Sequence, residues 1–515
     1  MSAPAPDLAR LRPCSWVACA AQLLLLLAAL RHHYVWGESE RWPWLLPLLN
    51  TGEALAVLLA AGLSAFAWWR AMGKAEAVAP PLRRLVWLSV PLLLLAVVVP
   101  PFLTTDPIDY VVRGRVLAVH GANPYVTVAT EFPDDPFLQF GDKAWKSFPL
   151  PYGPVLANVQ GAAAWLAHQL PLPPRGELVV ALGLLKLLFA GSLLFAATCL
   201  ARVAAASGGA AAAARTFVAV AWNPLLLVEG VANAHNEPLL VAFVAAAVLA
   251  AHRLQWMRGA VLLGLSVLTK VTPVVLGPLL LVRALRTGGL RALLLGGLVV
   301  VGLGGLFYLQ FFRADGAFDV LRRQGELSGA SLAWAGDQLT GAGVGPFVWL
   351  GRGVVVLVVA LGMWRLWRPA TSSSRAFSSA TRPSPSSTAS PASPAAPGPI
   401  PPAAPGSPSP AEPLVAPAAT ALAALACGGA ALFGVWYHCW WIPLALLGRR
   451  TFVARFAIAA SCTSLLAYLP WTFARRLDAP AQWCNVVFAV LLPLLIASWP
   501  PRRTSNPEVW SSGVA

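Results

Sequence analysis

Charged residues are scarce in this chain: Asp, Glu, Lys and Arg together make up 11% of its 515 residues. Soluble globular domains carry about 25% charged residues, and about 45–50% of their residues are apolar. Here 58% of the residues are hydrophobic, and the mean hydropathy is +0.67. These values fit poorly with a secreted enzyme, a nucleic-acid-binding domain or a disordered scaffold. They are typical of a polytopic membrane protein.

Cysteine is also sparse, with seven scattered residues and no Cys-x-x-Cys pair. The sequence therefore indicates neither a zinc site nor a disulfide framework. Acidic residues number 21 against 37 Lys and Arg, and the formal net charge is +16. Nucleic-acid binding is one explanation for such a charge, but membrane proteins gather Lys and Arg on their cytoplasmic loops. We favour the second explanation.

Long apolar runs are what the sequence has in abundance. Because backbone in lipid must satisfy its own hydrogen bonds, they predict an all-α integral membrane protein with about 11–13 transmembrane helices. The first run, 14–33, is too long for the core of a signal peptide and is interpreted as a retained anchor. Further runs of spanning length cover residues 51–72, 85–103, 177–201, 211–229, 237–254, 290–312, 346–366, 416–435, 451–472 and 480–499. Shorter or broken stretches cover residues 152–170, 259–283 and 436–448.

The basic residues predict the orientation of these helices. We place both termini in the cytoplasm and the loops 104–150 and 313–345 on the outer face. Arg202 and Arg215 also belong inside, which requires residues 152–201 to cross the membrane once and leaves open whether 152–170 spans. The other basic residues on the predicted inner side are Arg10, Arg12, Lys74, Arg83, Arg84, Arg253, Arg258, Arg283, Arg286, Arg291, Arg365, Arg368, Arg449, Arg450, Arg455, Arg502 and Arg503.

A Ser/Pro/Ala tract over residues 370–415 interrupts the apolar pattern. Such a composition cannot bury enough apolar surface to offset the entropy of ordering, so it predicts a disordered cytoplasmic linker. The linker separates an N-terminal transmembrane catalytic module, 1–369, from C-terminal transmembrane helices over 416–515.

The first candidate site lies in the predicted outer loop 104–150, which holds six of the acidic residues and opens with TTDPIDYVVRGR. Asp106 follows the end of a predicted span. It is either the N-cap of a helix that starts at Pro107 or a general base for a hydroxyl acceptor at the membrane surface. Arg113 and Arg115 can face a phosphate, although lipid headgroups satisfy them equally well.

A second polar cluster, WNPLLLVEGVANAHNE, begins at Trp222 and lies between two apolar runs. Ionisable groups at membrane depth are costly and mark function by default. His235 and Glu237 are of the types that bind metals, but two ligands make a weak case. The alternatives are hydrogen bonding to sugar hydroxyls or phosphate, and a polar helix turn at the outer interface.

Two further patterns contain a lysine and aromatic rings. Lys270 lies at the predicted tip of a hairpin of two short helices over 259–283. It either snorkels to the interface or meets an anionic group such as a polyprenyl phosphate. The run WYHCWW, which starts at Trp436, is either an aromatic belt or a set of rings that stack on sugars. Tyr152 has the same two interpretations.

Taken in order, these motifs resemble those of polytopic GT-C-type glycosyltransferases. The resemblance is strongest to bacterial polyprenol-phosphate-mannose-dependent mannosyltransferases (glycosyltransferase family 87-like). The family's Asp, the Tyr four residues on, Gly-Arg and Gly-x-Asn-Pro-Tyr match Asp106, Tyr110, Gly114-Arg115 and Gly121-Ala122-Asn123-Pro124-Tyr125. Its Trp-Asn-Pro, Glu-Gly and Gly-His-Asn-Asp correspond to Trp222-Asn223-Pro224, Glu229-Gly230 and Ala234-His235-Asn236-Glu237, where Ala234 and Glu237 depart from the pattern. Thr269-Lys270 and Trp436-Tyr437 also have counterparts.

The resemblance implies a GT-C-like bundle whose outer-face loops form the active site. It implies inverting transfer of a hexose, with mannose expected, from a polyprenyl-phosphate sugar to a glycolipid or glycan acceptor at the outer face of the cytoplasmic membrane. Asp106 would be the general base, with Asp109 as its substitute, and Lys270, Arg113 and His235 would face the leaving phosphate. We expect no metal or other cofactor and no nucleic-acid partner. The other residues expected to bind substrate are Tyr110, Arg115, Asn123, Tyr125, Tyr152, Asn223, Glu229, Asn233, Asn236, Glu237, Trp436 and Tyr437.

Two other functions also involve lipid-linked sugars. A flippase or transporter of lipid-linked sugars should show an internal repeat with broken helices at matching positions. The sequence has one clear break, at 270–273, and no matching partner. A polysaccharide polymerase or ligase would be distinguished by an oligosaccharide diphosphate donor.

Overall fold

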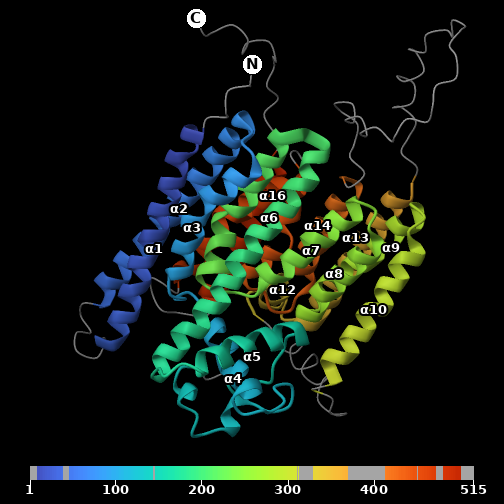
Figure 1. The fold of residues 1–515 in the computed structure, drawn as a ribbon. Coiled ribbons are helices and arrows are strands. Elements are labelled where there is room, and N and C mark those ends of the chain that lie inside the picture. Colours follow the sequence, from blue (N-terminus) through green and yellow to red (C-terminus); the bar gives the residue numbers. More distant parts are fainter. Residues whose placement is uncertain are drawn as a thin grey trace, which may run out of the picture.

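The computed structural model describes residues 8–38, 46–142, 145–309, 311, 329–368, 412–448, 451–470 and 479–499. Within these ranges the regular structure is helical, and the β contact is one isolated bridge between Gly329 and Leu432. Long helices run side by side in a bundle, and short helices cover one of its ends (Figure 1). The predicted all-α membrane fold is confirmed.

Three helices begin the described chain: α1 (Arg12–Glu38), α2 (Leu46–Val78) and α3 (Leu82–Val98). α1 packs against α2 and α3, and both α2 and α3 pack against α6 (Pro174–Ala221). Side chains reinforce the packing, since the Trp68 indole donates to the Ala219 carbonyl at 3.0 Å. These helices form one side of the bundle.

α6 has two helical arms, because its backbone leaves the helical conformation at Gly208 and Gly209. Gly209 has φ +62°, a left-handed backbone that glycine adopts without steric cost. Arg202 and Arg215 flank this break, and Arg215 pairs with Glu76 near the end of α2 at 3.4 Å. Both arginines therefore lie toward one end of the bundle, as the positive-inside pattern requires.

Residues 152–170 do not form a span. They fold into α5 (Pro154–His168), which packs against α4 (Asp106–Ala118) beyond the end of the bundle (Figure 1). α5 is not among the helices that are long and apolar enough to cross a membrane. The structure therefore answers the question that the sequence left open about this segment: it is a short helix and not one of the candidate spans.

The described elements that follow α6 in the N-terminal module run from η4 to α13 (Val344–Trp367). Arg286, at the end of α9, donates to the Leu366 and Arg368 carbonyls at 2.8 and 2.6 Å. These hydrogen bonds satisfy backbone carbonyls at the C-terminal end of α13. The elements are η4 (Leu226–Ala232), α7 (Glu237–His252), α8 (Trp256–Thr269), η5 (Thr272–Leu276), α9 (Gly277–Arg286), α10 (Leu290–Leu309), α12 (Leu332–Thr340) and α13 (Val344–Trp367).

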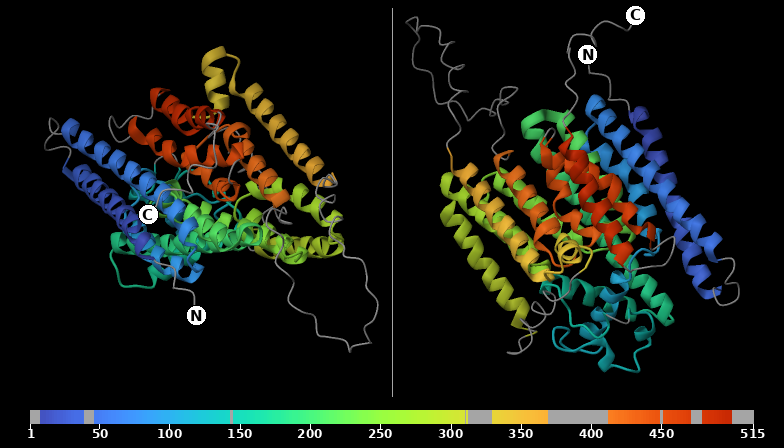
Figure 2. Two further views of the ribbon diagram at one scale, coloured as in Figure 1. Left: turned by 90° about the horizontal axis from the view of Figure 1, so that it is seen from above. Right: turned by 180° about the vertical axis from the view of Figure 1, so that it is seen from behind.

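The helices after the linker pack back into the N-terminal module (Figure 2). α14 packs against α9 and α13, α15 against α6, and α16 against α2. The backbones of α13 and η7 come so close that a Cβ on Gly351 would collide with the Gly428 carbonyl. Of the predicted linker 370–415, residues 370–411 lie outside the described ranges, as do residues 313–328 of the predicted second outer loop. The C-terminal elements are α14 (Glu412–Ala424), η7 (Leu425–Gly429), η8 (Val435–Trp440), α15 (Ile442–Ala445), α16 (Phe452–Thr463), η9 (Ser464–Tyr468), α18 (Ala479–Asn485), η10 (Val486–Leu491) and α19 (Leu492–Ser498).

Six helical segments in the described residues are long and apolar enough to span a membrane, and a bent pair makes a seventh. The prediction of about 11–13 transmembrane helices was made by counting apolar runs of about 20 residues. Several of those runs form shorter helices, such as Trp256–Thr269, Leu414–Gly429 and Phe452–Tyr468. The six are Leu8–Arg31, Thr51–Val78, Pro174–Ala221, Leu290–Leu309, Val344–Trp367 and Ala479–Ser498.

The outer group of helices has its own small core and its own ion pairs. α4, η2 (Ala129–Glu131), η3 (Pro136–Gln139) and α5 pack around Tyr110, Phe137 and Leu156. Arg115 pairs with Asp135 at 3.1 Å and with Glu177 at the start of α6. This group fixes the first turn of α4 at the end of the bundle.

Candidate active site

Asp106 is the first residue of α4, and Thr105 occupies the N-cap position. The N-cap side chain makes no capping hydrogen bond, and the Asp106 amide donates to Thr104 Oγ1 at 3.2 Å. The carboxylate therefore does not hold the capping role that the sequence left open. Its side chain is 21% exposed, so α4 presents an accessible carboxylate where the chain leaves the bundle.

The segment between α6 and α7 folds into a buried polar turn. Asn223 Oδ1 accepts from the amides of Leu225 and Leu226 at 3.0 and 3.2 Å, where the π-helical η4 begins. The chain then bends by 115° between η4 and α7. Ala234, at this bend, has φ +53°, a conformation in which glycine pays no steric cost. The bend therefore explains why the family pattern carries Gly at this position.

His235 connects the polar turn to α4. Its Nδ1 lies 3.6 Å from Asp106 Oδ2, and its Nε2 lies 3.3 Å from Glu229 Oε2. The imidazole stacks flat on Trp436, with ring centroids 4.2 Å apart and planes at 11°. Five polar side chains of this turn are completely buried: Glu229, Asn233, His235, Asn236 and Glu237.

Lys270 lies in an extended conformation directly after α8. Its Nζ donates to Glu237 Oε1 at 2.7 Å, and the Trp440 indole donates to the same oxygen at 3.3 Å. The rings of Tyr152, Tyr437 and Trp440 surround the ammonium, with centroids 5.1 to 5.6 Å away. The lysine charge is therefore already paired and stacked on aromatic faces.

Two tyrosines and an asparagine link α4 to the polar turn. The Asn236 amide donates to the Tyr110 hydroxyl at 2.9 Å, and the two hydroxyls of Tyr110 and Tyr152 are 3.5 Å apart. The two rings meet edge to face at 5.5 Å. Residues far apart in sequence thus form one continuous polar cluster.

Three buried acceptors in this cluster have no hydrogen-bond donor among the described residues: Glu237 Oε2, Asn233 Oδ1 and Asn236 Oδ1. The nitrogens of both amides are used, because Asn233 donates to Glu229 at 3.4 Å and Asn236 donates to Tyr110. Buried polar atoms without partners are unusual in folded proteins. Groups that carry several hydroxyl donors, such as a sugar, match such acceptors chemically.

Asp109 and Arg113 lie on α4 beside the cluster, and both form hydrogen bonds with the backbone of the outer segment that follows η3, at Asp142 and Trp145. Asp109 Oδ1 accepts from the Asp142 amide at 3.3 Å, and Arg113 donates to the Trp145 carbonyl at 3.2 Å. Burial raises the pKa of Asp109 to about 7, although the Arg113 guanidinium opposes this shift. Asp109 is 2% exposed, so it is much less accessible than Asp106.

Four predicted site residues have partners outside the cluster. Arg115 belongs to the ion pairs of the outer helices, and Asn223 donates to Ser461 on α16 at 2.8 Å. The remaining two, Asn123 and Tyr125, donate to the Phe311 carbonyl at 2.7 Å and the Tyr152 carbonyl at 2.9 Å. Asp109 and Arg113 lie beside the cluster. The structure brings together the other eleven: Asp106, Tyr110, Tyr152, Glu229, Asn233, His235, Asn236, Glu237, Lys270, Trp436 and Tyr437.

Two residues of the cluster were not predicted from the sequence. Trp440 belongs to the aromatic run that begins at Trp436, so its position was signalled but its contact with Glu237 was not. Tyr468 donates to Glu229 Oε2 at 3.1 Å. A single hydroxyl near the end of an apolar run carries no local signal of such a contact.

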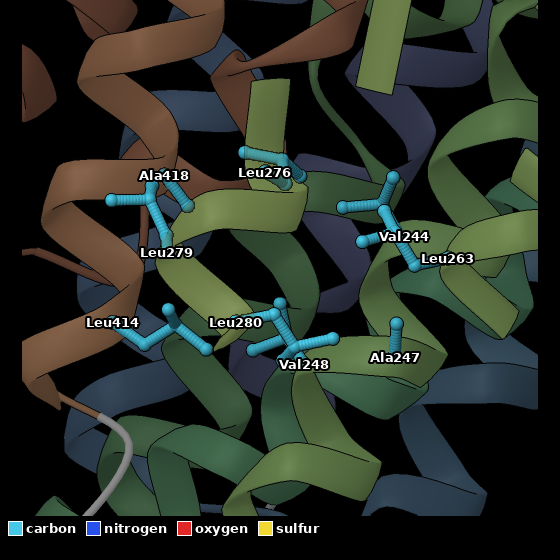
Figure 3. Close-up of a pocket in the computed structure, with 9 residues that line it drawn as sticks. All are labelled: Val244, Ala247, Val248, Leu263, Leu276, Leu279, Leu280, Leu414 and Ala418. Carbon is cyan, nitrogen blue, oxygen red and sulfur yellow. The ribbon is translucent and has the colours of Figure 1, made fainter. Parts of the chain in front are cut away.

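An apolar cavity lies further along α7, the helix that starts at Glu237. It is a partly open pocket between α7, α8, η5, α9 and α14. Figure 3 shows that every residue labelled around it is apolar, including Val244, Leu279 and Leu414. Such walls accommodate hydrocarbon and exclude charged groups.

Among the described residues, no group of three or more His, Cys, Asp and Glu side chains is arranged to hold a metal ion. His235, Asp106 and Glu229 come close to one another without forming such a group. The expectation of a metal-free site stays a prediction.

Two comparisons with known proteins agree with the motifs. Residues 15–286 match the family described as alpha-(1→6)-mannopyranosyltransferase, N-terminal domain. Alpha-(1→6)-mannopyranosyltransferase A of Corynebacterium glutamicum is 25% identical to this chain over 196 residues. That match covers 38% of this chain and 37% of the relative, and no solved structure matches.

The family match contains most of the polar cluster, from Asp106 to Lys270, and it ends before the aromatic run at Trp436. It covers more than half of the chain, and the fold around it consists of membrane helices. The expected resemblance to GT-C-type mannosyltransferases is confirmed. The chain belongs to the alpha-(1→6)-mannopyranosyltransferase family of membrane glycosyltransferases.

Proposed function

We propose that this chain transfers mannose from a polyprenyl-phosphate donor to a hydroxyl of a glycolipid or glycan acceptor, with inversion at the anomeric carbon. The α-(1→6) linkage in the family's name is the linkage that we propose for the product. The observation that carries the proposal is the meeting of an accessible carboxylate, Asp106, with a buried polar turn and the Glu237–Lys270 pair.

Asp106 is the general base of this proposal. It takes the proton of the acceptor hydroxyl while that oxygen forms a bond to the anomeric carbon. The bond between this carbon and the phosphate oxygen breaks, and its electron pair leaves with the lipid phosphate. The exposure of Asp106 supports this role, because an acceptor must reach the carboxylate directly.

Lys270 is the proposed partner of the leaving phosphate. An ammonium has three donors, and one of them is used by Glu237 at 2.7 Å. The other two remain for phosphate oxygens, whose developing charge needs donors aimed at it. Arg113, buried beside the cluster, and His235 are the next candidates.

The unpartnered acceptors of Asn233, Asn236 and Glu237 support binding of the sugar hydroxyls in the same region. The rings of Tyr152, Tyr437 and Trp436 supply faces on which a sugar can stack. The apolar cavity along α7 supports a place for part of the donor's hydrocarbon chain. We therefore assign sugar, phosphate and lipid to neighbouring parts of one site.

The distribution of charge along the helices supports an active site on the outer face of the cytoplasmic membrane. α3 starts next to Arg83 and Arg84, and Asp106 follows its other end. α7 begins with Glu237 and ends beside Arg253. Because Lys and Arg mark the cytoplasmic side, the cluster belongs to the opposite side, with both termini in the cytoplasm.

The test is a transfer assay on the purified full-length protein in lipid vesicles, with radiolabelled polyprenyl-phosphate mannose and a membrane extract as acceptor source. We expect labelled mannose in an acceptor fraction that resists mild acid, which cleaves the donor. Movement of the labelled donor across the bilayer without transfer would contradict the proposal and indicate a flippase. Use of an oligosaccharide diphosphate donor instead would indicate a polymerase or ligase.

A further inference from the structure

Glu229 is a completely buried carboxylate that has no access to an acceptor. Its Oε2 accepts a hydrogen bond from the Tyr468 hydroxyl at 3.1 Å and lies 3.3 Å from His235 Nε2. Its Oε1 accepts a hydrogen bond from the Asn233 side-chain amide at 3.4 Å. Burying a carboxylate is costly unless hydrogen bonds and an opposite charge compensate it. The neighbours of Glu229 therefore point to a task that it performs through another residue.

That residue is His235, which lies between two carboxylates. Its Nδ1 faces Asp106 Oδ2 at 3.6 Å on the side opposite to Glu229. A neutral imidazole has one N–H and one lone pair, so it can serve only one of two carboxylates. The imidazolium has two N–H groups and can direct one at each carboxylate, at the observed separations of 3.6 and 3.3 Å, which are ion-pair contacts rather than hydrogen bonds. Stacking on Trp436 fixes the plane of the ring in this position.

We propose that Glu229 and Tyr468 are positioning residues that hold His235 protonated on both nitrogens, and that His235 in turn aims the ionised Asp106 at the acceptor hydroxyl. This inference rests on the proposed function. Asp106 Oδ2 faces the histidine, so Oδ1 is left for the acceptor proton. Asp106 then returns that proton to water through its exposed side, and His235 keeps its own protons throughout.

The other charged group near the imidazole is Glu237. Its charge is paired with Lys270 at 2.7 Å, so it adds less to the field at His235 than Asp106 and Glu229 do. The Tyr468 hydroxyl is uncharged and acts on the Glu229 oxygen that faces the ring. Removing the Glu229 charge therefore removes one of the two carboxylates that flank the imidazole and retain its second proton.

The prediction concerns the pH profile of kcat in the transfer assay. In the wild type the activity falls at alkaline pH when His235 loses its second proton. Glu229→Gln keeps the shape and removes the charge, so we expect this alkaline limb to move by about one pH unit or more toward lower pH. At pH values above that limb, we expect kcat to fall by about 10–100-fold, the usual cost of losing an orienting partner. We expect the KM for the donor to change by less than about 3-fold.

Tyr468→Phe is the milder variant, and it keeps the inference testable if Glu229→Gln does not fold. It leaves the carboxylate and removes one hydrogen bond, so we expect the limb to move in the same direction by a smaller step. The matched control is Glu76→Gln, because Glu76 is another carboxylate in an ion pair, with Arg215 at 3.4 Å beside the Gly208–Gly209 break of α6, and it contacts no residue of the polar cluster in the described part of the chain. Its pH profile should match that of the wild type.

A double variant tests whether Glu229 acts through His235. His235→Gln alone should lower kcat, and adding Glu229→Gln to it should change kcat by less than about 2-fold, because residues that act as a unit are not additive. An unchanged alkaline limb in folded, active Glu229→Gln and Tyr468→Phe variants would overturn the inference and leave the proposed function intact. Absence of transfer by the wild type would overturn the proposed function itself.

Discussion

At the scale of single residues, the cations around the site are paired before any substrate arrives. Lys270 pairs with Glu237, and His235 lies between Asp106 and Glu229. Unpaired charge next to a membrane interior is costly, so pairing is the arrangement that the fold can hold stably. A phosphate that enters the site must therefore share Lys270 with Glu237 rather than meet a free charge.

Ala234 provides a prediction at this scale. An L residue in the left-handed region costs about 1–2 kcal/mol, and a glycine costs about 0.5–1 kcal/mol of additional chain entropy. Since Ala234 has φ +53°, we expect Ala234→Gly to stabilise the protein by about 0.5–1 kcal/mol in thermal unfolding. Ala232→Gly, in the helical segment η4, is the control and should destabilise by about 1 kcal/mol. A lower melting temperature for Ala234→Gly would contradict the argument.

The roles of single residues were predicted unevenly from the sequence. The family resemblance placed Asp106, His235 and Lys270 in one site, and the structure brings them together through the Asp106–His235 and Glu237–Lys270 contacts. Arg115 was expected at the substrate, but it is paired with Asp135 and Glu177. Such pairing across the fold leaves no trace in local spacing.

At the scale of elements, breaks in helices make the site. α4 starts with Asp106, η4 and α7 meet at a bend of 115°, and α8 ends immediately before Lys270. Helix ends expose backbone groups and allow polar side chains at membrane depth only where protein buries them. The break at Lys270 was predicted from Thr272 and Pro273, whereas the π-helical form of η4 was not, because no residue type signals it.

α4 also carries a prediction about pH. An unperturbed Asp has a pKa of about 3.9, whereas burial raises the pKa of Asp109 to about 7. Between these values the folded protein holds a proton that the unfolded chain has lost, so stability falls as the pH rises from about 4 to 7. Asp109→Asn cannot ionise, and we expect it to be more stable than the wild type by about 1–3 kcal/mol at pH 8 and equal to it at pH 4. The measurement is thermal unfolding at both pH values.

The control for this prediction is Asp134→Asn, which alters an exposed carboxylate in the same outer part of the protein. It should leave the pH dependence of unfolding as it is in the wild type. Equal stability of Asp109→Asn and the wild type at pH 8 would contradict the prediction, because it would show that burial does not disfavour the ionised Asp109 carboxylate.

At the scale of the whole molecule, the C-terminal helices complete a site that the N-terminal module begins. Trp436 stacks on His235, Trp440 donates to Glu237, and Tyr468 donates to Glu229. The sequence predicted two modules and a linker, and it placed Trp436 at the site through the resemblance. The contact of Tyr468 joins residues 239 positions apart, a separation that no local pattern can reveal.

This packing predicts that the covalent connection between the modules is dispensable once the protein has folded. The Ser/Pro/Ala composition of residues 370–411 predicts disorder, so we expect a protease site inserted there to be cleavable in the folded protein. We expect the two fragments to remain together on size-exclusion chromatography and to keep transfer activity, because α14, α15 and α16 pack on α9, α13, α6 and α2. Separation of the fragments under mild detergent conditions would contradict this expectation.

The central claim is that Asp106 is the base of a mannosyl transfer, and one comparison tests it most directly: kcat of Asp106→Asn against the wild type, with polyprenyl-phosphate mannose as donor. General-base catalysis contributes about 10²–10⁴-fold, so we expect a loss of that size in a variant that is folded, inserted in the membrane and able to bind donor. Wild-type turnover by a well-folded Asp106→Asn protein would contradict the account.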